Sequence, residues 1–317
     1  MSSMEIALRG PGGEPVDLAR TLNSHGFAAL SPSALDEEAG TLETTLRVPA
    51  GRPRRVRIGR GRAGYARATI LGPAAGPRIR DAVRSGVRHV LRMDQNLAGF
   101  YTSVAADPDL AWAATGAGRM LQSPSVFEDV VKTVCTTNCA WSATRRMVDA
   151  LVTDLGEPCV GDGPPITNAF PTPDAMAEAP ESFYRETARA GYRGAYLISL
   201  ARLVTDGVLD LDALAAEGPD RLPDDELEGQ LLGLPGVGPY AAAHIMMTMG
   251  RNSRLILDSW TRPTYASKLG RTKLVSDVAI RRRFRRYGEH AGLAFWLFVT
   301  SDWVTQPDER PTASPQG

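Results

Sequence analysis

Cysteine and long apolar runs are both scarce in this sequence, and each scarcity excludes a class of protein. The chain has three cysteines in 317 residues, too few for a disulfide framework and typical of a reducing compartment. The longest apolar run covers only residues 293–299, far short of a membrane span. The first residues, MSSMEIALRGPGG, lack the apolar segment of a secretion signal. We therefore expect a cytoplasmic protein without a membrane partner.

Net charge is also absent. The 36 Lys and Arg residues balance 36 Asp and Glu residues, so the molecule as a whole does not attract polyanions. Any binding of nucleic acid must depend on a local basic or dipolar surface. The apolar content of 43% is enough for a core, and the length allows two domains or one large one.

The pattern of the chain changes from strand to helix near residue 75. Thr41 to Val48 alternates, with one face formed by Leu42, Thr44, Leu46 and Val48. Residues 1–75 therefore predict a small N-terminal antiparallel sheet domain with a helix or two, followed by the linker 72–76. Helical periodicity dominates residues 76–304, which predicts a helical domain, and the polar tail 305–317 is predicted to be disordered. The fold class is α+β.

The stretch from Leu231 to Trp260 carries the clearest pattern. A helix ends near Leu234, a tight turn follows, and a second helix begins at Pro239, which suits a first helical turn. Gly236 and Gly238 in this turn can take backbone angles closed to other residues. The free N–H groups and the positive dipole at the start of the second helix would seat a phosphate. Asp258 is the first carboxylate after that helix, behind an apolar run.

This arrangement resembles the helix-hairpin-helix (HhH-GPD) DNA glycosylase superfamily, whose signature is LPGVGxxxA followed by a catalytic aspartate. The signature occupies Leu234 to Gly238 with Ala242, and the aspartate falls on Asp258. Phe127 to Trp141 is similar to the family's pair of helices whose loop enters the DNA. Gly191-Tyr192-Arg193 resembles the 8-oxoguanine and 3-methyladenine glycosylase branch, whose members have an N-terminal antiparallel sheet domain.

The resemblance implies that Asp258 stabilises the positive charge that develops on the deoxyribose as the base leaves, and that it orients or deprotonates water. The alternative is that Asp258 only caps the following helix, and both roles can coexist. Pro263 would interrupt a helix that started directly at Asp258, so we expect that helix to begin later.

Tyr240 occupies the position at which bifunctional family members carry a lysine nucleophile. Without an amine no Schiff base forms, so we expect no strand cleavage by β-elimination. Some family members without this activity also carry tyrosine here, packed near the sugar or the flipped base. A plain core tyrosine is the alternative.

Three further residues are expected to contact DNA. Asn138 matches the family position that enters the vacated space or reads the unpaired base, with helix capping as the alternative. Trp141 flanks it. Arg193 matches a position that contacts the opposite base in the 8-oxoguanine branch, and its alternative is a surface or phosphate-binding arginine.

No cofactor is expected for catalysis. Four cysteines are needed for the iron–sulfur cluster of the endonuclease III branch, and Cys135, Cys139 and Cys159 cannot supply them. As in the family, the hairpin carbonyls are expected to hold one K⁺ or Na⁺. We interpret His25 as a turn or core residue and His244 as a core residue.

Together these features predict a monofunctional DNA glycosylase that acts as a monomer on double-stranded DNA containing a damaged or modified base. Such an enzyme rotates the nucleotide out of the duplex and hydrolyses its N-glycosidic bond. Two alternatives stay open at this stage. One is a non-enzymatic helix-hairpin-helix protein that only binds DNA, and the other is a glycosidase that acts on free nucleosides.

Overall fold

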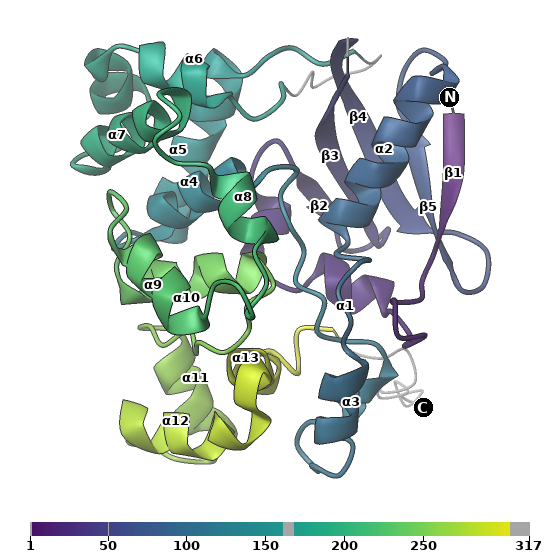
Figure 1. Ribbon diagram of the computed structural model, residues 1–317, viewed down its shortest axis with the longest axis vertical. Coiled ribbons are helices and arrows are strands. Elements are labelled where there is room, and N and C mark those ends of the chain that lie inside the picture. The colour runs from purple at the N-terminus through teal and green to yellow at the C-terminus, as the bar shows by residue number, and fades with distance from the viewer. Residues whose placement is uncertain (1, 50, 161–167, 305–317) are drawn as a thin grey trace, which may run out of the picture.

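A computed structural model describes residues 2–49, 51–160 and 168–304 of the chain. A twisted sheet forms one side of the molecule, and helices form the rest (Figure 1). The predicted α+β class, with an N-terminal antiparallel sheet before a helical region, is confirmed. The tail 305–317 lies outside the described residues, so its predicted disorder stays a prediction.

The sheet has five strands among the described residues, in the order β1-β5-β4-β3-β2, and every neighbouring pair is antiparallel. The strands are β1 (Ser2–Ala7), β2 (Ala34–Asp36), β3 (Thr41–Val48), β4 (Gly51–Arg60) and β5 (Tyr65–Ile70). The predicted inner face of β3 is confirmed, because Leu42, Thr44, Leu46 and Val48 are all buried, but Thr45 on the opposite face is buried too. A bulge lies between Leu46 and Val48, next to the turn into β4.

Helix α2 (Pro77–Val90) lies across the sheet in Figure 1. Its Val83, Val87 and Val90 share one hydrophobic core with the buried residues of the strands. Gly86 faces the sheet closely, since a Cβ atom there would lie 3.0 Å from Leu46 Cδ1. The helical periodicity after residue 76 thus begins with a helix that completes the core of the sheet.

Helix α1 adds Leu22 to the core of the sheet, and the other helices build two further hydrophobic cores, one on each side of α10. The helices are α1 (Leu18–Leu22), α3 (Ala98–Val104), α4 (Val126–Thr136), α5 (Trp141–Ala150), α6 (Pro173–Glu178), α7 (Arg193–Thr205), α8 (Leu211–Ala216), α9 (Asp224–Leu232), α10 (Pro239–Thr248), α11 (Thr261–Lys268), α12 (Asp277–Phe284) and α13 (Ala291–Val299). We call the core around α4 and α7 the first lobe, and the core around α13 the second lobe.

Helix α10 belongs to both lobes. Ala242 and Ile245 pack into the first lobe, whereas Ala243 and Met247 pack into the second. The N-terminal segment also reaches the first lobe, because Phe27 from the short 3₁₀ turn η1 (Gly26–Ala29) packs there. Both features matter for the site, which opens where the two lobes meet.

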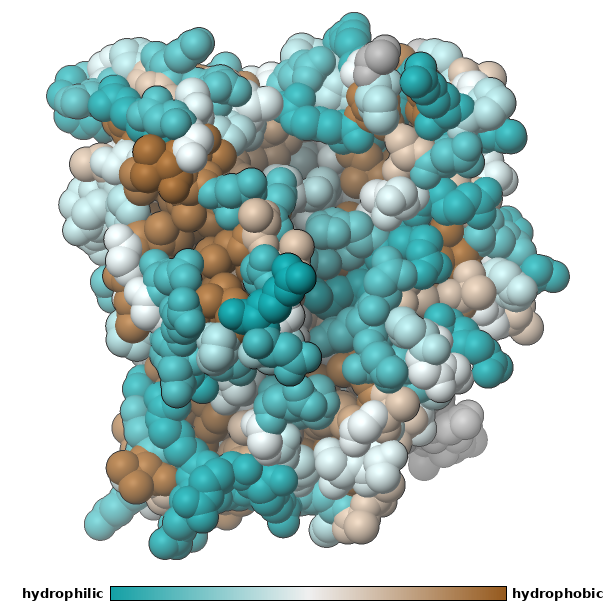
Figure 2. Space-filling view, in the orientation of Figure 1, coloured by the Kyte–Doolittle hydropathy of each residue, from teal (hydrophilic) through white to brown (hydrophobic). Residues whose placement is uncertain are grey.

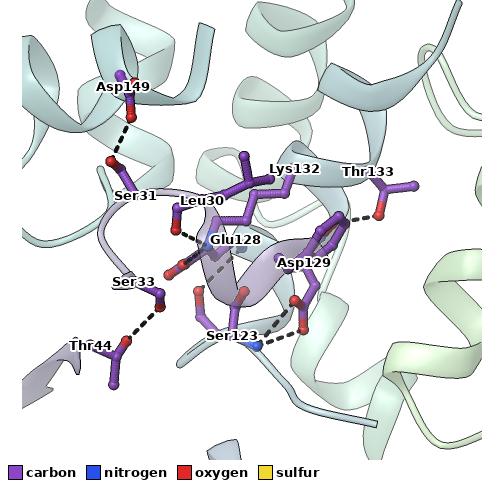
Figure 3. Close-up of polar contacts among 12 residues, drawn as sticks. Leu30, Ser31, Ser33, Thr44, Ser123, Glu128, Asp129, Lys132, Thr133 and Asp149 are labelled. Atoms are coloured by element: carbon purple, nitrogen blue, oxygen red, sulfur yellow. Dashed lines mark hydrogen bonds and ion pairs between the residues drawn. The ribbon is translucent and has the colours of Figure 1, made fainter. Parts of the chain in front are cut away.

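Helix α4 is central, because all its residues from Val126 to Cys135 are buried. Ser125 caps it by accepting a hydrogen bond from the Glu128 N–H. Figure 3 shows the polar side chains that this helix carries into the interior. Glu128 and Lys132 form an ion pair with 2.6 Å between Oε1 and Nζ, and the Asp129 carboxylate accepts the Ser123 N–H.

Within the described part of the chain, no helix has the length and apolar character needed to cross a bilayer. On the face seen in Figure 2, hydrophobic residues gather between α7 and α9. Leu232, at the end of α9, and Val208, just after α7, are among the exposed large hydrophobic residues.

Candidate active site

A cavity of about 1310 Å³ opens between the two lobes at the N-terminal end of α10. Its lining comes from the η1 turn, the α4–α5 loop, the start of α7, the hairpin before α10, the turn before α11, and α13. Six of the seven site residues predicted from the sequence lie in this lining: Asn138, Trp141, Gly236, Gly238, Tyr240 and Asp258. The seventh, Arg193, does not line it.

The hairpin between α9 and α10 requires only one of its two glycines for conformational reasons. Gly236 has φ +79°, and a Cβ atom there would lie 2.8 Å from Tyr196 Cδ2 and 3.1 Å from Val134 Cγ1. Gly238 has φ −102° and ψ −176°, angles that any residue can adopt. Gly238 therefore does not use the conformational freedom that glycine offers. Because Gly238 has no side chain, it leaves open the space beside the start of α10.

That space lies in front of the α10 N-terminus. Gly238 is the N-cap, no side chain caps the helix, and Pro239 follows in the first turn. A Cβ atom at Gly238 would meet no atom within 4 Å. The first N–H groups of the helix are thus uncapped at the edge of the cavity, where they can bind an anion.

We expect Gly238→Asp to stabilise the fold and to weaken the binding of duplex DNA that the sequence predicts. The carboxylate would cap α10 and raise the stability by a few tenths of a kcal/mol over glycine. It would also occupy the site in front of the helix and repel a phosphate there. Gly238→Asn is the matched control, because it caps without charge. Thermal unfolding and fluorescence anisotropy with a duplex would measure both effects. Equal duplex affinity for wild type and Gly238→Asp would exclude a phosphate at this helix end.

Asp258 both lines the cavity and caps α11. Its Oδ1 atom accepts the N–H groups of Trp260 at 2.8 Å and Thr261 at 2.6 Å. Its own N–H donates to Thr261 Oγ1 at 2.9 Å. The helix begins at Thr261, later than Asp258 as expected, so Pro263 lies in the first turn, where no intrahelical N–H bond is needed. Capping and an exposed position in the cavity therefore coexist.

The carboxylate of Asp258 is held firmly but is not enclosed. The residues before it, Leu255, Ile256 and Leu257, are buried, whereas Asp258 itself is partly exposed. Only Oδ1 makes hydrogen bonds with the described residues, which leaves Oδ2 available to a ligand. A fixed carboxylate of this kind can stabilise positive charge that develops beside it.

Tyr240 lies on the first turn of α10, inside the cavity. Its hydroxyl is 3.3 Å from Thr136 Oγ1, and its ring stacks on His244 with 6.2 Å between centroids. Burial raises the pKa of Tyr240, and the negative charge of Asp258 adds to this, while the Thr136 hydrogen bond opposes it. The phenol therefore stays neutral at physiological pH. No lysine is found among the lining residues that the structure describes.

Asn138 lies in the loop between α4 and α5 with φ +47°, a left-handed conformation that asparagine tolerates. Its side chain caps neither helix. The amide donates to the Tyr192 hydroxyl at 3.4 Å, and both side chains are exposed at the edge of the cavity. Trp141, the first residue of α5, is 42% exposed in the same region.

Arg193 contacts this loop from inside the protein. It is 7% exposed, and its Nε donates to the Thr137 carbonyl at 2.9 Å. Its guanidinium also lies 4.6 Å from the centre of the Tyr192 ring. In this structure Arg193 fixes the backbone next to Asn138, a role that differs from both interpretations of the sequence. A contact between Arg193 and a DNA base stays a prediction.

Apart from Tyr240, the aromatic residues at the back of the cavity were not identified from the sequence. His25, Phe27, Tyr240 and His244 form what we call the inner wall. The His25 and Phe27 rings pack on His244 with centroid distances of 5.7 and 4.8 Å. Trp260, Trp296 and Trp303 form a second aromatic group in the lining, with centroids 5.5 to 6.0 Å apart. Such surfaces suit a flat, aromatic ligand.

Both histidines of the inner wall are neutral. Burial lowers the pKa of His25 to about 4, although its bond to the Leu121 carbonyl opposes this. Burial likewise lowers the pKa of His244 to about 3, and His25 contributes in the same direction. The inner wall therefore carries no positive charge at neutral pH.

The pKa of His244 predicts a pH-dependent difference in stability. In the unfolded chain histidine titrates near 6.5, so between pH 6.5 and about 3 only the unfolded state binds this proton. His244 thus reduces the free energy of unfolding as the pH falls, by about 1.4 kcal/mol per pH unit. Relative to wild type, His244→Phe should gain that amount per unit below pH 6.5. Guanidinium unfolding at pH 7.5, 6 and 5 would measure it, and parallel pH curves would contradict it.

No group of three or more His, Cys, Asp or Glu side chains suited to a metal occurs among the described residues. Cys135 is buried, and the Cys139 thiol lies 3.2 Å from the Cys135 carbonyl.

In the arginine-rich segment of α12 and the following turn, Arg283 and Arg286 bind Asp109 and Asp107. Those two arginines are therefore already paired within the protein.

Known proteins resemble this chain in structure rather than in sequence. No family model matches it, and no curated protein matches its sequence. A 3-methyladenine DNA glycosylase from Archaeoglobus fulgidus superposes with a TM-score of 0.71 at 19% identity, over 94% of this chain and 97% of that one. The apo 8-oxoguanine glycosylase/lyase from Clostridium acetobutylicum superposes with a TM-score of 0.69 at 18% identity, over 94% and 96%.

The same Clostridium enzyme bound to double-stranded DNA, with cytosine opposite 8-oxoguanine, has a TM-score of 0.65 at 19% identity and covers 88% of this chain and 92% of its own. The chain therefore has the fold of the helix-hairpin-helix DNA glycosylases. Within that fold it resembles the 3-methyladenine and 8-oxoguanine glycosylases, whose structures match it over nearly its whole length.

Proposed function

We propose that the protein is a DNA glycosylase that removes a damaged or modified base from double-stranded DNA by hydrolysis of its N-glycosidic bond. One observation carries the proposal. The carboxylate of Asp258 lies in an aromatic cavity that begins at the uncapped N-terminus of α10. A helix N-terminus suited to a phosphate, an aromatic cavity suited to a base and a fixed carboxylate therefore occur together, in a fold shared with DNA glycosylases.

The reaction begins with rotation of the nucleotide out of the duplex, at an unstacking cost of a few kcal/mol. The N–H groups at the start of α10 hold a backbone phosphate, and the extruded base enters the cavity against the inner wall. Asn138, exposed on its loop, fills the gap left in the duplex. The internal bonds of Arg193 to the Thr137 carbonyl keep this loop in place.

Bond cleavage follows at the sugar. As the base departs, positive charge develops on the deoxyribose, and the Asp258 carboxylate stabilises it more strongly in the transition state than in the ground state. The two backbone N–H bonds to Oδ1 fix its orientation, while Oδ2 stays available to the sugar or to the attacking water. Water then adds to C1′ of the sugar and loses a proton, the departed base gains one, and an abasic site is left.

We infer that the enzyme is monofunctional. A β-elimination mechanism needs an amine that forms a Schiff base with the sugar, and Tyr240 stands where such a lysine would be. No lysine is found among the described residues that line the cavity. Borohydride added during turnover should therefore trap no covalent complex with DNA, and the Clostridium glycosylase/lyase provides a positive control. A strong trapped band on denaturing gels would establish lyase activity instead.

The hairpin carbonyls also suit a monovalent cation. The oxygens of Leu231 and Leu234 accept hydrogen bonds within the turn. Those of Gly233, Pro235 and Val237 accept none among the described residues. Oxygen ligands of this kind suit a hard cation, so we propose that K⁺ or Na⁺ binds here and strengthens the contact with the phosphate.

The proposed function is tested by incubating the protein with duplexes that carry alkylated, oxidised or deaminated bases. Abasic sites, revealed by alkaline cleavage, are the expected product on at least one substrate. Duplex binding without any base release would leave a DNA-binding protein that performs no chemistry. Release from free nucleosides, with binding that does not depend on salt, would favour a nucleosidase, because duplex binding weakens steeply with salt.

A further inference from the structure

The inner wall ends at His244, which neither the phosphate contact nor Asp258 uses. His244 lies four residues after Tyr240 on α10, roughly 6 Å further along the helix axis. A base whose sugar lies at Asp258 would therefore reach His244 with the edge remote from its glycosidic bond. Whether that edge meets a hydrogen-bond donor or an acceptor depends on which nitrogen of the His244 imidazole carries the proton.

The hydrogen bonds around Thr133 decide the position of that proton. The Thr133 hydroxyl donates its single proton to the Asp129 carbonyl at 2.7 Å. The same oxygen lies 3.3 Å from His244 Nδ1, so there it can only accept. Nδ1 therefore carries the proton of His244, and Nε2 carries a lone pair.

Nε2 of His244 faces the cavity. This nitrogen makes no hydrogen bond with the described residues. Some of their polar atoms are fully buried without a partner, but Nε2 of His244 is not one of these, so it is accessible rather than enclosed. The ring itself lines the cavity. His25 differs, because both of its nitrogens are occupied: Nε2 donates to the Leu121 carbonyl at 2.7 Å, and Nδ1 accepts the Phe27 N–H at 3.3 Å.

His244 also cannot easily become a donor at Nε2. Its ring is enclosed by Phe27, Tyr240 and His25, with Thr133 on the other side, and no carboxylate in this group favours the charged form. Burial keeps its pKa near 3. At neutral pH the back of the cavity thus presents a hydrogen-bond acceptor.

We propose that Nε2 of His244 selects a flipped-out base that carries an N–H group on the edge remote from its glycosidic bond. The inference rests on the proposed function and adds a substrate class to it. Amino groups such as those of adenine-like and cytosine-like bases, and ring N–H groups at that edge, satisfy the acceptor. An edge with only carbonyl oxygens or C–H groups displaces water from the lone pair without replacing its hydrogen bond.

Binding to uncleavable duplexes tests this selection. Each duplex carries one 2′-fluoroarabino nucleotide, whose electron-poor sugar resists cleavage, opposite a tetrahydrofuran abasic analogue, so that no base pair is lost on flipping. The matched bases are adenine against purine and cytosine against 2-pyrimidinone, which differ only by the amino group. A duplex with tetrahydrofuran in both strands reports contact with the backbone alone. Dissociation constants come from fluorescence anisotropy.

The amino-bearing base should bind about tenfold more tightly in at least one pair, the effect of one hydrogen bond to a desolvated partner. In His244→Phe this preference should fall below threefold. The variant removes the acceptor but leaves the Thr133 hydroxyl bonded to the Asp129 carbonyl. His290→Phe is the matched control, because His290 packs against Phe100 outside the cavity. Its preference should equal that of wild type.

Two results would overturn the inference while leaving the proposed function intact. One is binding of the tetrahydrofuran reference with no preference in either pair, and the other is a preference that survives in His244→Phe. If no duplex binds, the reference included, the proposed function fails and the inference falls with it. Should His244→Phe prove unstable, His244→Met removes the same acceptor with a more adaptable side chain.

Discussion

Asp258→Asn should excise bases at least about 100-fold more slowly than wild type, the usual loss when a group that stabilises transition-state charge is removed. The asparagine oxygen can still accept the N–H groups of Trp260 and Thr261, so the cap of α11 is retained while the negative charge is lost. Single-turnover excision from the best substrate of the panel is the measurement. The melting temperature and the duplex affinity should change little.

Asp258→Ala is the matched comparison. It removes the charge and the cap together, so it should lose activity and also about 1 kcal/mol of stability. The two variants thus separate catalysis from folding at one position. If Asp258→Asn excised bases at the wild-type rate, another group would have to carry the chemistry.

The second large effect is on stability. Lys132→Met should lower the free energy of unfolding by about 3–5 kcal/mol, because it leaves the Glu128 carboxylate buried without its partner. Both side chains of the pair are at most 2% exposed, and Lys132 also donates to the Leu30 carbonyl at 3.4 Å (Figure 3). The loss should be smaller at pH 5 than at pH 8, since protonation of Glu128 relieves the unpaired charge. Urea unfolding at both pH values measures it.

The double variant Glu128→Leu with Lys132→Met provides the control. Removal of both charges exchanges an ion pair for apolar packing, which is often neutral or stabilising. The double variant should therefore be more stable than Lys132→Met alone. Equal stability of the two would mean that the unpaired charge is not the cause of the loss.

The local parts of the site could be read from the sequence because they depend on short-range rules. A Gly-Pro turn before a helix, followed by an apolar run and an aspartate, specifies its own geometry. The structure accordingly brings Gly236, Tyr240 and Asp258 together in one cavity. The roles of Tyr240 in catalysis and of Gly236 in DNA contact remain predictions.

The parts that the sequence could not give depend on tertiary contacts. His25 reaches the inner wall only because the η1 turn packs into the first lobe beside α10. Nothing in the segment Ser24-His25-Gly26 indicates that contact. Arg193 was expected to contact DNA, but its guanidinium lies inside the protein and donates to the Thr137 carbonyl at the end of α4. The sequence around an arginine does not indicate which backbone carbonyl will accept a hydrogen bond from its guanidinium.

The membership of α10 in both lobes has a consequence for how a base is admitted. Ala242 and Ile245 anchor the helix to one lobe, and Ala243 and Met247 anchor it to the other. A hinge motion that widened the cavity by separating the lobes would break the apolar contacts on one face of α10. The two lobes should therefore behave as a rigid clamp of fixed span. In the proposed binding of DNA, the duplex rather than the protein should then supply most of the deformation.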